Sequence, residues 1–198
     1  MAGLCLTRQI AFAAAACSRA GYVFAVCHGA TQPATFDAAL AKLWTGITTD
    51  DLPTIEAVCR PLMDVPESGA DDTLDRDWMA WLTLATFEFP AALVSTRLPV
   101  QTLAQCSALM RTLMGEIDLR LGWRGLPMEG RLATLESTAQ ESCLAILGED
   151  PSNPEVPVRE LVAAGAAVAR LVAASAADLA EATGWKLWPP AAPPDGGD

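Results

Sequence analysis

The chain has 198 residues, a length that corresponds to a single domain with one substantial core. Its 24 acidic and 13 basic side chains give a net charge of −11, which repels phosphate backbones and predicts that the protein does not bind nucleic acid. Hydrophobic residues make up 52% of the chain, so the chain as a whole is not disordered.

The six cysteines are dispersed along the sequence, and no CxxC pair is present. Zinc sites need closely spaced pairs of ligands, so we expect no metal and no cofactor. Most of the cysteines have apolar neighbours, which is typical of buried free thiols in a reducing compartment and predicts a cytoplasmic protein. The apolar run after Arg8 is similar to a secretory signal, but it is short and Arg19 interrupts it, so we expect neither export nor a membrane span.

Apolar residues recur at helical spacing nearly throughout the chain, which predicts an all-α, single-domain bundle of about seven helices. The first helix is predicted over residues 4–27, with Gly21 as a point where it bends or divides. Thr35 is predicted to cap a second helix, whose inward-facing residues run from Phe36 to Ile47.

A third helix is predicted over residues 53–63, with Asp50 and Asp51 before its first turn and Pro61 ending it early. A fourth helix, over residues 73–95, follows a loop rich in helix breakers. Pro90 lies inside the apolar pattern of this fourth helix. Because proline removes a backbone donor, we expect a kinked central helix.

A fifth helix begins at Pro99 and carries the most regular apolar pattern of the chain, which predicts a buried helical partner. A sixth helix is predicted over residues 129–147. A seventh, over residues 158–183, is rich in alanine and glycine, and these small residues are predicted to let neighbouring helices approach closely. The helical domain is predicted to span residues 1–187, followed by a mobile tail rich in proline and glycine over residues 188–198.

Asp71, Asp72 and Asp75 form a DDxxD pattern, which all-α prenyl and terpene synthases use to bind magnesium and a diphosphate. Carboxylates one helical turn apart share a face and suit Mg²⁺. The second metal motif of those enzymes has no counterpart here, and the same aspartates are typical of an N-cap and first helical turn, so no metal site is expected. Together with Asp77 they are predicted to bind a protein partner.

Glu88 lies between two phenylalanines on the helix that contains Pro90. If Glu88 is buried, its carboxyl pKa is raised and it can act as a catalytic acid or base. In the alternative interpretation it lies at the solvent edge of the helix, or pairs with Arg97, Arg8 or Arg19.

Trp78 and Trp81, together with Arg97, are the residues predicted to bind a small molecule if the protein is an enzyme. The two tryptophans then form a wall of the pocket and Arg97 lies beside the catalytic carboxylate. Aromatic residues at helical spacing are also typical of a hydrophobic core, so the sequence leaves both interpretations open.

His28 is the only histidine of the chain and directly follows Cys27. Neighbouring residues of a helix point about 100° apart, so the two side chains cannot form a nucleophilic Cys–His pair while the segment is helical. We expect His28 to lie at the end of the first helix, where a cation interacts favourably with the helix dipole.

Two segments within the first 50 residues carry a family pattern: Gln9-Ile-Ala-Phe-Ala-Ala-Ala-Ala-Cys17-Ser-Arg19 with Tyr22 and Phe24 after it, and Asp37-Ala-Ala-Leu40-Ala-Lys-Leu-Trp44. Together they resemble the YjaG-like family of bacterial domains of unknown function. Ser18 stands where the family has an acidic residue, and the spacing to Tyr22 is shorter. The resemblance implies an all-α bacterial protein and assigns no catalytic residue.

The leading prediction is a non-catalytic acidic protein of a bacterial cytosol that binds another protein, as an immunity, accessory or regulatory subunit does. The expected contact surface is the aspartate run between residues 71 and 77, with the edge of the fourth helix. The alternative is a small all-α enzyme, or an auxiliary biosynthetic subunit, that binds a small molecule and uses Glu88 for acid–base chemistry.

Overall fold

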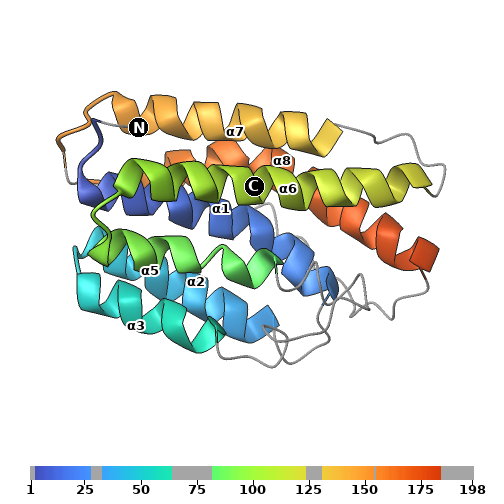
Figure 1. Ribbon diagram of the computed structural model, residues 1–198, viewed down its shortest axis with the longest axis horizontal. Helices are drawn as coiled ribbons and strands as arrows, with labels where there is room; N and C mark the ends of the chain where they lie inside the picture. The colour runs from blue at the N-terminus through green and yellow to red at the C-terminus, as the bar shows by residue number, and fades with distance from the viewer. Residues whose placement is uncertain (1–2, 28–32, 64–81, 124–130, 154, 184–198) are drawn as a thin grey trace, which may run out of the picture.

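The computed structural model describes residues 3–27, 33–63, 82–123, 131–153 and 155–183, and these residues form a helical bundle without strands (Figure 1). The predicted tail, residues 188–198, lies outside the described residues. The all-α single-domain fold is confirmed. Its helices are α1 (Leu6–Cys27), α2 (Pro33–Thr48), α3 (Leu52–Met63), α5 (Glu88–Ser95), α6 (Pro99–Trp123), α7 (Arg131–Gly148) and α8 (Val158–Thr183).

Helix α1 is the central element and packs against α2, α5, α6, α7 and α8 (Figure 1). Its residues from Ile10 to Cys17 are all buried, as expected of a helix that is apolar on more than one face. The helix is not divided at Gly21. A Cβ atom added at Gly21 would lie 2.7 Å from Cε1 of Phe36, so the glycine allows α2 to approach α1 closely.

A proline begins helix α2, and an aspartate caps the start of helix α3. Helix α2 begins at Pro33, a residue suited to the first helical position, so the predicted cap at Thr35 is wrong. The carboxylate of Asp51 caps α3, because it accepts hydrogen bonds from the backbone N–H of Thr54 at 3.1 Å and from its hydroxyl at 2.6 Å. Helix α3 continues through Pro61 to Met63, so the predicted early end is also wrong.

The predicted kink is present, and it lies one turn before Pro90. Residues 82–85 are helical, residues 86 and 87 form a turn, and α5 follows. Pro90 lacks the N–H that would bond to the carbonyl of Thr86, four residues earlier. That carbonyl instead accepts the N–H of Phe89 at 3.4 Å and the thiol of Cys17 at 3.3 Å. A side chain of α1 therefore binds a backbone group that the proline leaves free.

Helices α6, α7 and α8 complete the bundle over one side of α1 (Figure 1). The predicted helical partner of α6 is α7, which returns antiparallel to it. Helix α8 has the predicted limits, and α7 begins two residues later than predicted. The regular apolar pattern of α6 is buried, at Leu103, Cys106, Met110, Leu113, Met114, Ile117 and Leu121.

Candidate functional site

Several residues that the sequence singles out lie outside the described part of the chain. These are the acidic residues Asp71, Asp72, Asp75 and Asp77, the tryptophans Trp78 and Trp81, and His28. The predicted partner surface, the DDxxD pattern and the wall of the predicted pocket therefore stay predictions. Among the described residues, no cluster of histidine, cysteine, aspartate or glutamate has the geometry of a metal site.

Glu88 is exposed at the first residue of α5, where its carboxylate interacts favourably with the positive end of the helix dipole. Glu88 therefore lies at the solvent edge of the helix, as in the alternative interpretation, and is not the buried carboxylate of the enzyme hypothesis. Arg97 is also exposed, beyond the end of α5. Arg8 and Arg19 are buried and bind other groups.

The most prominent polar site of the described core is an ion pair between Arg19 of α1 and Glu136 of α7. Nε and one terminal nitrogen of Arg19 each lie 2.7 Å from a different carboxylate oxygen of Glu136. The side chains are 3% and 0% exposed. This two-pronged geometry is the strongest arrangement that an arginine and a carboxylate adopt.

Further polar groups surround the ion pair. The second terminal nitrogen of Arg19 donates to the carbonyl of Ala15 at 3.0 Å. The side-chain amide of Gln140 donates to Glu136 at 2.8 Å and to the carbonyl of Ser107 at 3.3 Å, and the Ser107 hydroxyl donates to the amide oxygen of Gln140. The network thus connects α1, α6 and α7, and its polar atoms form hydrogen bonds with one another.

Burial and neighbouring charges shift the pKa values of the ionisable groups in this network. Burial opposes the charge of Arg19, but the neighbouring carboxylate of Glu136 outweighs that penalty, and the pKa of Arg19 is raised. Burial raises the pKa of the Cys106 thiol to about 12 and also raises the pKa of the Cys143 thiol, although Arg19 opposes both shifts. Both cysteines are therefore neutral thiols at physiological pH, without the thiolate character that a nucleophile needs.

Arg8 stabilises the loop between α7 and α8 through hydrogen bonds to its backbone. Its three guanidinium nitrogens donate to backbone carbonyls of Asn153 at 2.6 Å, Leu147 at 2.8 Å and Glu155 at 2.9 Å. The carbonyl of Leu147 belongs to the last turn of α7, which needs donors from outside the helix. A buried arginine of α1 thereby ends α7 and positions the chain that enters α8.

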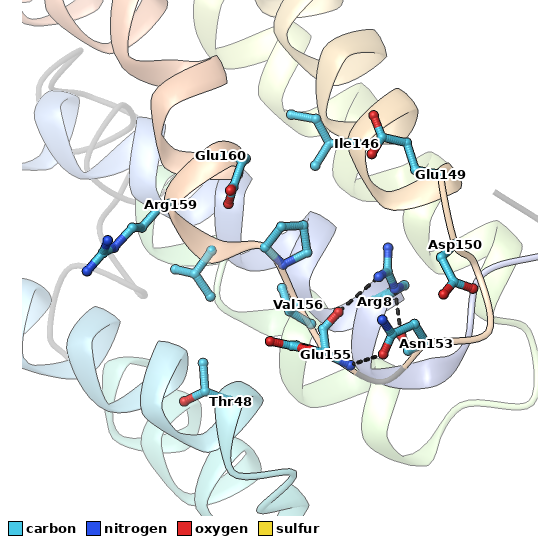
Figure 2. Close-up of a pocket in the computed structure, with 12 residues that line it drawn as sticks. Arg8, Thr48, Ile146, Glu149, Asp150, Asn153, Glu155, Val156, Arg159 and Glu160 are labelled. Carbon is cyan, nitrogen blue, oxygen red and sulfur yellow. Dashed lines mark hydrogen bonds between the residues drawn. The ribbon is translucent and has the colours of Figure 1, made fainter.

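A groove of about 540 Å³ lies beside Arg8 (Figure 2). In Figure 2 the Arg8 guanidinium points toward the carbonyls of Asn153 and Glu155, while Arg159 points away from them. Every guanidinium nitrogen of Arg8 is already engaged, so Arg8 contributes to the wall and is not held ready for an anion. The acidic residues of the rim are Glu149, Asp150, Glu155 and Glu160.

Asp118 of α6 holds the start of α7. Its Oδ2 atom accepts the backbone N–H groups of Leu132 at 2.9 Å and of Ala133 at 3.2 Å, so it caps α7 from another helix. Burial raises the pKa of the Asp118 carboxyl, although these hydrogen bonds oppose the shift. Oδ1 is buried without a hydrogen-bond partner among the described residues.

Helix α8 exposes several apolar residues, among charged ones, on its solvent side. Of the described helices, it alone is long and apolar enough to cross a membrane, over Val158–Leu179, yet only 39% of that apolar window is buried. The buried side packs against α1, α6 and α7. The opposite side, called here the outer face of α8, is exposed at Ala163, Ala167, Arg170, Ala174 and Asp178. The charged residues Arg159 and Glu160 are exposed at its start and Glu181 at its end.

The sequence gives an indication of the buried ion pair and of the solvent side of α8. Arg19 is a charged residue on an otherwise apolar helix, and such a residue needs a buried partner of opposite charge. The partner is Glu136 of α7, and the apolar pattern of α7 does not distinguish Glu136 from the other polar residues of that helix. In α8, Arg170 and Asp178 mark the solvent side, and helical spacing assigns Ala163, Ala167 and Ala174 to the same side.

Comparison of the chain with models of protein families, with curated proteins and with solved structures finds no match. The resemblance of its first 50 residues to the YjaG-like family therefore stays a prediction.

Proposed function

We propose that this chain is a non-catalytic protein of a bacterial cytosol that binds another protein through the outer face of α8. An immunity, accessory or regulatory subunit has this kind of role. The cysteines are dispersed along the sequence and the five that the structure describes are free, which supports a reducing compartment. The net charge of −11 supports a partner other than nucleic acid.

The observation that carries this proposal is the exposure of an apolar helix. A helix that serves only as core is buried on its apolar side and polar toward solvent. Helix α8 has three alanines along the middle of its solvent side, and Val162 beside them is 46% exposed. Exposed apolar residues gathered on one helix support a site where another molecule binds.

Helix α7 provides the contrast within the same bundle. Its exposed side carries Thr134, Thr138 and Glu141 and a single exposed alanine, Ala145. Helix α8, its longer neighbour, exposes three alanines and Val162.

The buried network around Arg19 and Glu136 supports the absence of catalysis. Its donors and acceptors bind one another, and the adjacent thiols of Cys106 and Cys143 are held neutral. The exposed Glu88 lacks the desolvation that tunes a catalytic carboxyl. No observation among the described residues favours the enzyme hypothesis.

Photo-crosslinking tests this function. A photoreactive amino acid replaces Ala167 of α8 in cells of the source organism, and a matched variant carries it at Thr138, an exposed position of α7. We expect a covalent protein adduct from position 167 and none from position 138. Absence of an adduct from position 167, or equal adducts from both positions, would contradict the proposal.

A further inference from the structure

We draw no further inference here: the strongest candidate, the groove beside Arg8 between the end of α2 and the loop that joins α7 to α8, has a rim of ordinary exposed carboxylates and an arginine whose guanidinium nitrogens all donate to backbone carbonyls, and nothing among the described residues shows which ligand would fill it.

Discussion

Arg19 and Glu136 are 117 residues apart in the sequence and form a buried, two-pronged ion pair with both contacts at 2.7 Å. The pair joins the central helix α1 to α7 at a point where both side chains are almost completely hidden from water. A buried charge without its partner is costly, so this contact fixes how the two helices align.

The effects of removing Arg19 and Glu136 on stability should not be additive. Glu136→Leu leaves the guanidinium of Arg19 buried and unpaired, which is expected to lower the free energy of unfolding by about 3–5 kcal/mol. In Arg19→Leu/Glu136→Leu neither charge remains, and the loss should be smaller than the sum of the two single losses. Urea denaturation of the three variants gives the coupling, and strictly additive losses would show that the pair does not stabilise the alignment.

Because α1 and α2 approach closely at Gly21, the addition of a single methyl group there should lower the stability of the fold. In Gly21→Ala the new Cβ lies 2.7 Å from the Phe36 ring, so the ring and α2 must shift, at an expected cost of about 1–3 kcal/mol. Gly115→Ala is the matched control, because nothing lies within 4 Å of its Cβ and alanine favours the helix. Thermal denaturation should show a lower Tm for Gly21→Ala and an equal or higher Tm for Gly115→Ala; the reverse order would be inconsistent with this packing.

Asp118 should make stability fall as the pH rises. Folding raises the pKa of its carboxyl, so its contribution to stability is fully present below the ordinary value of about 3.9 and is lost as the pH rises through the folded pKa. Asp118→Asn keeps an oxygen that can accept the N–H groups of Leu132 and Ala133, and it does not ionise. Relative to wild type, this variant should therefore gain stability as the pH rises above about 4.

The measurement is urea denaturation across that pH range, with Glu141→Gln on the exposed side of α7 as the control. The control should follow wild type. If Asp118→Asn instead lost stability relative to wild type as the pH increased, the charged carboxylate would be the favoured form and the sign given above would be wrong.

The buried thiols should resist alkylation. Burial raises the pKa of the Cys59 and Cys106 thiols to about 12, so both are protonated at pH 8 and also shielded from reagent. Cys5 is only partly buried and serves as the internal reference. Mass spectrometry after brief iodoacetamide treatment should find label on Cys5 and almost none on Cys59 or Cys106 until urea is added. Similar labelling of all three in the native protein would contradict this burial.

The helices could be predicted from the sequence because their signals are local. Apolar spacing and proline predict the observed start of α6 at Pro99 and both observed limits of α8. The predictions that depend on partners across the bundle were less successful. Glu88 has apolar neighbours in sequence but is the first residue of a helix that begins at a break, and the break depends on Pro90, Thr86 and Cys17 together.

The candidate sites could not be predicted as well, because they depend on contacts between distant segments. A charge such as Arg19 on an apolar helix indicates that a partner exists, but not that the partner is Glu136. The small residues of α8 are predicted to let neighbouring helices approach closely. Ala169 and Ala176 are buried, and the Cβ position of Gly165 lies 3.2 Å from Cδ of Arg19. Ala163 and Ala174 instead face solvent.

Photo-crosslinking along α8 tests binding by its outer face most directly. A photoreactive amino acid replaces Ala167 or Ala174, which are exposed, and in a matched variant it replaces the exposed Thr138 of α7. The account predicts covalent protein adducts from positions 167 and 174 and none from position 138. Absence of adducts from both α8 positions, or equal adducts from all three positions, would contradict it.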